Sequence, residues 1–191
     1  MASNDTEIEI KVKIENVEPL VSFLNKNAEF KSEERQIDEY FTPIHRNFLS
    51  IRPVKEWLRL RNENNRYSIN YKNWHFDENG KTSNCDEFET PVKDIEQMRK
   101  LFTTLDIKSI GKVDKTRKTW DYKDYEISVD IVNTLGTFVE IEFKGYSDEP
   151  KKITDEMVKF LEGIGVGKIQ RNYQGYPFLL LFPNEAKYYD E

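Results

Sequence analysis

Apolar and charged residues alternate strictly along the first stretch of the chain, from Thr6 to Ile14. In a strand such residues lie on opposite faces: Ile8, Ile10, Val12 and Ile14 on one, and Glu7, Glu9, Lys11 and Lys13 on the other. By itself the pattern is typical of an edge strand with one face in water. It becomes informative because later strands repeat the same design.

The same alternation predicts strands over 30–41, 57–61, 67–73, 85–90, 112–122, 125–132 and 138–144. The irregular, aromatic C-terminal segment is expected to contain a last strand over the apolar run 178–182. Apolar residues at helical spacing predict three helices, capped by Asn16, Asp94 and Thr154. The first helix is expected to end near Asn27. No linker or repeat of fixed period interrupts the chain, so we expect a single domain over 1–191 with its core at about 6–182.

Charged side chains gather on the polar faces of these predicted strands. The acids are Glu7, Glu9, Glu87, Glu89, Asp130, Glu140 and Glu142, and the bases are Lys11, Arg59, Arg61, Lys72, Lys115, Arg117 and Lys144. If the apolar faces pack outward under the helices, the charged faces point at one another across a closed or nearly closed sheet. A barrel of about eight strands can hold side chains or one small ligand. The simpler alternative is an open sheet with a solvated charged face.

A lumen lined with charge favours a ligand that carries both signs, because desolvating unpaired ions costs several kcal/mol. A polyphosphate with divalent cations fits this requirement. Lysine and arginine neutralise phosphate oxygens. Carboxylates bind Mg²⁺ or Mn²⁺, which prefer oxygen ligands.

Composition excludes several classes of protein. The 191 residues are 37% hydrophobic and 34% charged, with a net charge of −6, which argues against a nucleic-acid-binding protein. A single cysteine, Cys85, fits a reducing cytosol. The sequence has neither a signal peptide nor an apolar run of transmembrane length, so we expect a cytoplasmic protein without a membrane partner.

These charged strands resemble a known family. Glu7-Ile8-Glu9-Ile10-Lys11 resembles the ExExK signature of the CYTH superfamily, the triphosphate tunnel metalloenzymes, and the resemblance covers roughly residues 6–182. Further matches follow in the family's order: Leu58–Arg61, Tyr71-Lys72, Glu87–Glu89, Lys115–Arg117, Asp130 and Leu135–Glu142. The resemblance implies an α+β fold, an antiparallel eight-stranded β-barrel or tunnel with flanking helices.

Within the superfamily, Gln36–Phe41 and His45–Phe48 are most similar to the class IV adenylyl cyclases. Cys85 stands where the family often has an arginine, which weakens one expected phosphate contact. The resemblance implies that ATP is converted to cyclic AMP and pyrophosphate with Mg²⁺ or Mn²⁺, and it suggests a homodimer.

The resemblance also implies roles for individual residues. Five acids would hold one or two metal ions: Glu7, Glu9, Asp130, Glu140 and Glu142. Seven bases would hold the triphosphate: Lys11, Arg59, Arg61, Lys72, Lys115, Arg117 and Lys144. Those closest to the chemistry would be Glu7, Glu9, Lys11, Lys115 and Arg117.

Two other functions fit the same residues. A triphosphatase would use the same tunnel to hydrolyse inorganic triphosphate, thiamine triphosphate or a nucleoside triphosphate. A module that binds a triphosphate without turnover is a third hypothesis, which the complete set of acids disfavours because simple anion binding needs bases. We assign no catalytic role to His45, His75 or Cys85, and we interpret the Gly163–Gly167 stretch as a helix stop rather than a phosphate loop.

Overall fold

The computed structural model of the protein describes residues 8–76 and 82–191, with the backbone alone for 82–84. Glu7 therefore lies outside the described residues. The described strands form one antiparallel sheet in the order β10-β9-β1-β8-β7-β6-β2-β3-β4-β5. The predicted antiparallel sheet with flanking helices is confirmed. The sheet has ten strands rather than eight, and the described strand order is open rather than closed into a ring.

The strands and helices have the following bounds. The strands are β1 (Ile8–Ile14), β2 (Glu29–Pro43), β3 (Glu56–Glu63), β4 (Arg66–Phe76), β5 (Thr82–Val92), β6 (Ile107–Tyr122), β7 (Tyr125–Val132), β8 (Gly136–Phe143), β9 (Ile169–Arg171) and β10 (Tyr189–Asp190). The helices are α1 (Glu18–Asn27), α2 (Ile95–Thr104), α3 (Pro150–Ile164) and α4 (Gly175–Leu181). None of the described helices is both long enough and apolar enough to span a membrane.

The chain divides into two compact units, and the long strands β2 and β6 contribute to both. The unit that contains α2 comprises 35–114 and 176–185, and we call it the α2 unit. The unit that contains α3 comprises 8–34, 115–175 and 186–191, and we call it the α3 unit. Each unit has an apolar core of its own.

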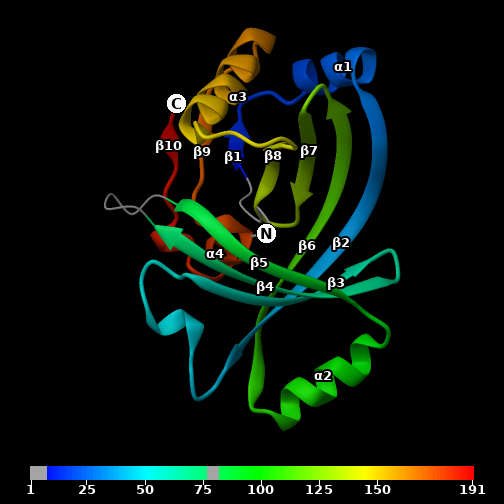
Figure 1. Cartoon of the computed structure of the whole chain (residues 1–191), viewed down its shortest axis with the longest axis vertical. Helices are drawn as coiled ribbons and strands as arrows, with labels where there is room; N and C mark the ends of the chain where they lie inside the picture. Colours follow the sequence, from blue (N-terminus) through cyan, green and yellow to red (C-terminus); the bar gives the residue numbers. More distant parts are fainter. Residues whose placement is uncertain (1–7, 77–81) are drawn as a thin grey trace. The chain divides into compact units, whose positions relative to one another are not determined.

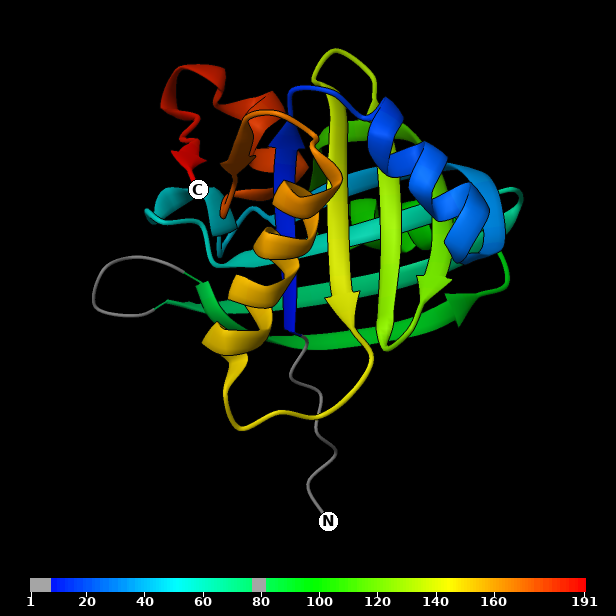
Figure 2. The ribbon, with the colours of Figure 1, turned by 90° about the horizontal axis from the view of Figure 1, so that it is seen from above.

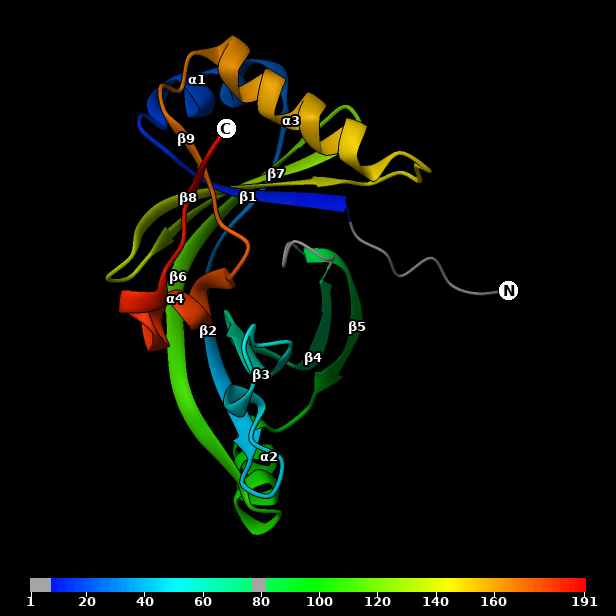
Figure 3. The same cartoon turned by 90° about the vertical axis from the view of Figure 1, so that its left-hand side faces the viewer.

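In the α3 unit, helices α1 and α3 cover the apolar face of strands β1, β8 and β7 (Figures 1 and 2). The inward isoleucines of β1 alternate with its charged residues, as the sequence predicts, and Ile10 is only 1% exposed. Met157 and Leu161 of α3 are fully buried in this core. Figure 3 shows both helices on the same side of these strands. The opposite face of the strands carries the charged side chains.

In the α2 unit, helix α2 packs its apolar stripe on the face of β2 and β3 that bears Phe41 and Leu60. Asp94 caps the helix by accepting hydrogen bonds from the N–H groups of Glu96 and Gln97, as the sequence predicts. The β3–β4 hairpin turns at Asn64 and Asn65, both with positive φ, which is the geometry of a tight two-residue turn. This turn sets the register that places Arg59 opposite Asn70.

Two sequence predictions near the C-terminus are wrong. Residues 178–182 were expected to form a strand, but Gly175–Leu181 is helix α4, whose start is fixed by the Asn172 side chain. A short apolar run fits a buried strand and a buried helix equally well. The third helix begins at Pro150 rather than after Thr154, because proline is well suited to the first helical turn.

Removing a core leucine should destabilise the α2 unit. Leu60 is fully buried, so we expect Leu60→Ala to lower the free energy of unfolding by about 2–5 kcal/mol, as urea unfolding would measure. Leu105→Ala is the matched control, because Leu105 is 61% exposed and its loss should cost well below about 1 kcal/mol. Equal effects of the two variants would contradict this packing.

Candidate functional site

Charged side chains form registered rows on the polar face of the α3 unit. Lys11 of β1 lies opposite Glu140 of β8, and Glu9 lies opposite Glu142. Across the next pair of strands, Arg117 of β6 lies opposite Asp130 of β7. Side chains that face each other across neighbouring strands are close enough to interact directly. The strict alternation of each strand therefore brings these predicted site residues together.

Three bases and two acids form one connected cluster on this face, which we call the basic cluster: Lys11, Lys115, Arg117, Asp130 and Glu140. The Arg117 guanidinium donates to both oxygens of Asp130, each at 2.7 Å, and to Glu140 at 3.0 Å. Lys115 donates to Asp130 at 2.8 Å, and Lys11 lies 2.9 Å from Glu140. The cluster therefore carries one net positive charge.

Burial and charge work against each other at these acids. Burial opposes ionisation of Glu140, but Arg117, Lys11 and Lys115 hold its pKa well below the ordinary value. Burial likewise opposes ionisation of Asp130, and Lys115 and Arg117 lower its pKa. Asp130 has no exposed surface, so its charge is compensated entirely by these neighbours. Both acids are ionised in the folded protein and hold the bases in place.

A second group on the same face is acidic. Glu126 of β7 and Glu9 of β1 flank Glu142 of β8 on its two sides, and we call Glu9, Glu142 and Glu126 the acid row. Burial raises the pKa of Glu142, and the charges of Glu126 and Glu9 add to that rise, against a hydrogen bond from Lys144. Like charges directly opposite each other destabilise a sheet. This row would therefore be stabilised by a cation.

In the α2 unit, the polar face of β2, β3 and β4 gathers a second set of bases. Arg61 donates to both oxygens of Asp38, at 2.7 and 2.8 Å, and Arg59 lies 3.4 Å from the same carboxylate. Asp38 is only 2% exposed. Burial opposes protonation of Arg59, but Asp38, Tyr40 and Glu89 raise its pKa. Its buried Nε has no hydrogen-bond partner among the described residues, so this group could receive an anionic oxygen of a ligand.

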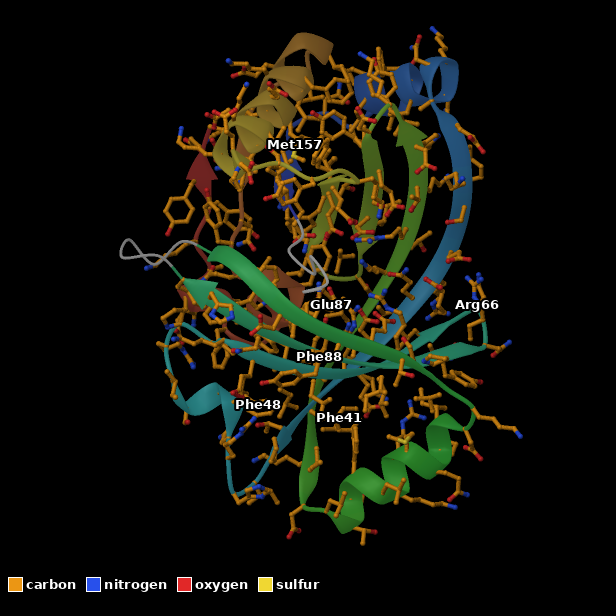
Figure 4. All side chains as sticks on the ribbon, in the orientation of Figure 1. Phe41, Phe48, Arg66, Glu87, Phe88 and Met157 are labelled. Carbon is orange, nitrogen blue, oxygen red and sulfur yellow. The ribbon has the colours of Figure 1, made fainter. Side chains whose placement is uncertain are left out.

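The carboxylate of Glu87 on β5 lies 2.8 Å from the ammonium of Lys72 on β4 and also accepts a hydrogen bond from Asn70. Burial opposes ionisation of Glu87, but Lys72 lowers its pKa. Phe88, the next residue, lies on the other face of β5 and stacks on Tyr71. Glu87 and Phe88 are both labelled in Figure 4. These two neighbours show that one strand presents a charged face and an apolar face.

The structure thus sorts the predicted site residues by unit. The α3 unit holds Glu9, Lys11, Lys115, Arg117, Asp130, Glu140, Glu142 and Lys144, and the α2 unit holds Arg59, Arg61, Lys72, Glu87 and Glu89. Sequence reasoning missed three contributors, Asp38, Asn70 and Glu126. The available signal for Glu126 was its position two and four residues before Ser128 and Asp130, which places all three on one face of β7.

Comparison with known proteins identifies the family. The profile of the CYTH domain matches residues 5–176, so the chain belongs to the CYTH domain family. A Methanocaldococcus jannaschii protein named as a candidate adenylate cyclase is 35% identical over 173 residues, which cover 87% of this chain and 95% of that protein. The predicted CYTH resemblance is confirmed.

Solved structures agree with this assignment at the level of fold. The PH1819 protein of Pyrococcus horikoshii is 28% identical, with a TM-score of 0.74 and coverage of 94% of this chain and 99% of that one. A Hippeastrum protein described as a candidate adenylyl cyclase with a dominant triphosphatase activity is 19% identical, with a TM-score of 0.67 and coverage of 95% and 97%.

The residues of the α3 unit fit a divalent cation in chemical type. The acid row offers carboxylate oxygens, which Mg²⁺ and Mn²⁺ prefer, and the repulsion at Glu142 favours a cation there. Among the described residues, no three acid, histidine or cysteine side chains already converge closely enough to hold an ion. A cation held by this row would therefore require its side chains to rotate toward the ion.

Breaking the buried contact of Asp130 should be costly near neutral pH. We expect Asp130→Asn to lower the free energy of unfolding by about 3–5 kcal/mol, because Lys115 and Arg117 lose their buried counter-charge. The folded-state pKa of Asp130 is lowered, so its stabilisation is complete above the unfolded-state pKa of about 4 and is lost as the pH falls through the folded-state value. The difference between wild type and variant should therefore shrink in urea unfolding at about pH 3.

Asp121→Asn is the matched control for this prediction. Asp121 pairs with Lys31 in the same unit, but both side chains are well exposed, at 39% and 44%. Its loss should cost below about 1 kcal/mol. A loss at Asp130 as small as that at Asp121 would contradict the buried role of Asp130.

Proposed function

We propose that the protein is a metal-dependent enzyme that acts on a triphosphate, and that its reaction is the cyclisation of ATP to cyclic AMP and pyrophosphate. The observation that carries this proposal is the separation of charge on one sheet face of the α3 unit, with a net positive basic cluster beside an acid row. A metal triphosphate carries the same two signs side by side. Members of the CYTH family are typically metal-dependent enzymes that process triphosphates.

The bases would bind the phosphate chain. Lys11, Lys115 and Arg117 are held by buried carboxylates and need little reorganisation to receive phosphate oxygens, which is the condition for strong electrostatic stabilisation. In the α2 unit, Arg59 is the best-placed group, because its Nε is buried without a partner among the described residues. We propose Arg61 and Lys72 as further phosphate ligands.

The acids would hold the cation. We propose Glu9 and Glu142 for this role, together with Glu7, Asp130 and Glu140 as further candidates. Asp130 and Glu140 are already bonded to bases, so their main contribution is to orient Arg117, Lys115 and Lys11. When bound, Mg²⁺ or Mn²⁺ would supply charge neutralisation for the triphosphate and lower the pKa of the attacking hydroxyl.

In the cyclisation, the 3′ oxygen of the ribose attacks the α-phosphorus of ATP. The new bond from oxygen to phosphorus forms as the bond to the β-phosphate oxygen breaks. Pyrophosphate leaves with the electron pair, and the proton of the attacking hydroxyl passes to the solvent. The protein's own part is positioning and charge stabilisation, as is usual in phosphoryl chemistry. The 35% identity with a candidate adenylate cyclase over most of both chains supports this reaction.

A triphosphatase is the second candidate, and the dominant triphosphatase activity described for the Hippeastrum neighbour favours it. Here water attacks the terminal phosphorus, the bond from that phosphorus to its bridging oxygen breaks, and the diphosphate part leaves with the electron pair. The attacked phosphorus is released as orthophosphate, and the protons of the water pass to the products and the solvent. The same bases and acids serve both reactions, because the two differ only in where the nucleophile lies along the phosphate chain.

We propose that both units take part, as one functional domain over 1–191.

One experiment separates these functions. The protein is incubated with Mn²⁺ or Mg²⁺ and with ATP, inorganic triphosphate or thiamine triphosphate, and the products are resolved. Cyclic AMP with pyrophosphate supports the cyclase, and orthophosphate supports the triphosphatase. Tight binding without any product would instead indicate a module that binds triphosphate, and would overturn the proposed enzyme.

Glu9→Gln should abolish turnover with either metal ion, because the amide removes one negative charge from the acid row. The midpoint of urea unfolding should stay close to that of the wild type, since the Glu9 side chain lies on the polar face, away from the apolar core. Glu33→Gln serves as the control, because Glu33 pairs with Lys118 at a side chain that is 51% exposed. Wild-type activity of Glu9→Gln would remove Glu9 from the site.

A further inference from the structure

Two buried side-chain atoms of the α2 unit have no hydrogen-bond partner among the described residues, the carbonyl Oε1 of Gln36 and the Nε of Arg59. Gln36 is only 4% exposed. On the paired strands β2 and β3, Gln36 lies opposite Glu63 and Tyr40 lies opposite Arg59, so both atoms belong to the same polar face. A buried polar atom without a partner is costly, and each one in a folded protein requires an explanation.

The orientation of the Gln36 amide is fixed by its neighbour. A carboxylate only accepts hydrogen bonds, so the amide nitrogen of Gln36 donates to Glu63, and a flipped amide would place two acceptor oxygens together. Arg66, labelled at the β3–β4 hairpin in Figure 4, lies 3.0 Å from Glu63 and holds it in turn. The nearby Arg61 donates to both oxygens of Asp38. The Gln36 carbonyl is therefore left as an acceptor for an external donor.

The two unpartnered atoms are opposite in kind, because the N–H of Arg59 donates and the carbonyl of Gln36 accepts. Gln36 and Tyr40 are four residues apart on β2, which corresponds to about 13 Å along a strand. The Arg59 guanidinium lies 3.4 Å from Asp38, between these two positions, so the unpartnered atoms are closer together than that. A ligand that satisfies both must carry an anionic oxygen at one end and an N–H donor at the other.

This requirement separates the candidate substrates by their chemistry. Inorganic triphosphate has phosphate oxygens at both ends and no N–H donor. In ATP, the exocyclic amino group of adenine lies at the opposite end of the molecule from the phosphates. The ribose hydroxyls lie nearer the phosphate chain than the base does, so the span from Arg59 to Gln36 favours the base.

We propose that Gln36 is a specificity-determining residue, whose side-chain carbonyl accepts a hydrogen bond from an exocyclic amino group on the substrate's heterocycle while Arg59 binds a phosphate oxygen. ATP and thiamine triphosphate carry such a group, and inorganic triphosphate does not. A ligand without this donor leaves the buried acceptor desolvated and unpaired, and it is disfavoured for that reason. This inference rests on the proposed function and deepens it, because it names the class of triphosphate.

The first test changes the ligand and needs no variant. Dissociation constants are measured by calorimetry on the full-length protein, with a chelator present so that metal-dependent turnover does not consume the ligand. The ligands are ATP, inorganic triphosphate and purine riboside triphosphate, which differs from ATP only in lacking the amino group. The wild type should bind ATP about tenfold more tightly than purine riboside triphosphate, as expected for one hydrogen bond at a buried site. Equal affinities would overturn the proposal.

Gln36→Leu tests whether this residue is the acceptor. ATP should bind the variant about tenfold more weakly, at the level of purine riboside triphosphate, whereas the other two ligands should keep their wild-type affinities. The bond from Gln36 to Glu63 is lost for every ligand, so it cancels in the comparison between ligands. An equal loss for all three ligands would indicate a structural role, and a retained preference for ATP would place the acceptor elsewhere. Either result would overturn the proposal.

Asn73→Leu is the matched control, because it also replaces a side-chain amide by leucine in the α2 unit. Asn73 is adjacent to Lys72 on β4 and therefore lies on the opposite face of the strand. Its preference for ATP over purine riboside triphosphate should equal that of the wild type. Circular dichroism and urea unfolding check that both variants are folded. A loss of preference as large as that of Gln36→Leu would show that the effect does not come from the Gln36 acceptor.

Failure of this inference and failure of the proposed function are distinguishable. If affinity depends on the amino group and on Gln36 but no triphosphate is turned over with Mn²⁺ or Mg²⁺, the inference holds and the enzyme assignment falls. If product forms but affinity does not depend on the amino group, the enzyme assignment holds and the inference falls.

Discussion

The pairing of unlike charges across neighbouring strands is the constraint on which the candidate site depends. Asp130 is fully buried, yet it stays ionised because two bases of β6 compensate its charge. Arg117 lies opposite it on the adjacent strand, and Lys115, two residues before Arg117, also contacts it. Without that register, the buried carboxylate would lack its counter-charges, and an uncompensated buried charge is strongly destabilising. The register also fixes the bases themselves, so the contacts that stabilise the charged face also hold in place the side chains that we propose as phosphate ligands.

The charged faces of the two units differ in how completely their acids are paired with bases or hydrogen-bond donors. In the α3 unit, acids and bases separate into a basic cluster and an acid row that lie on the same strands. In the α2 unit, Asp38, Glu87 and Glu89 are each already engaged by Arg61, Lys72 or Asn70. The α2 unit therefore has no comparable unbalanced row of acids among its described residues. This difference is why we propose the cation site for the α3 unit.

Much of this organisation follows from the sequence because period-two alternation is a strong signal. Alternation alone predicts the strand at Ile8–Ile14, and it groups Lys115 with Arg117 and Glu140 with Glu142. What alternation cannot give is the register between strands, which decides that Arg117 faces Asp130 and that Glu126 faces Glu142. Helix α4 was missed for a different reason. Its residues form a continuous apolar run, which has no periodicity that could distinguish a helix from a strand.

Each strand of the site presents a charged face and an apolar face, as the neighbours Glu87 and Phe88 illustrate on β5. A substitution on one face leaves the other in place, so the ligand chemistry can diverge while the core is retained. An insertion or deletion of a single residue within β8 would instead move every carboxylate beyond it into the apolar core. Related sequences can therefore vary in length at the turns, whereas the strands between those turns must keep the same number of residues.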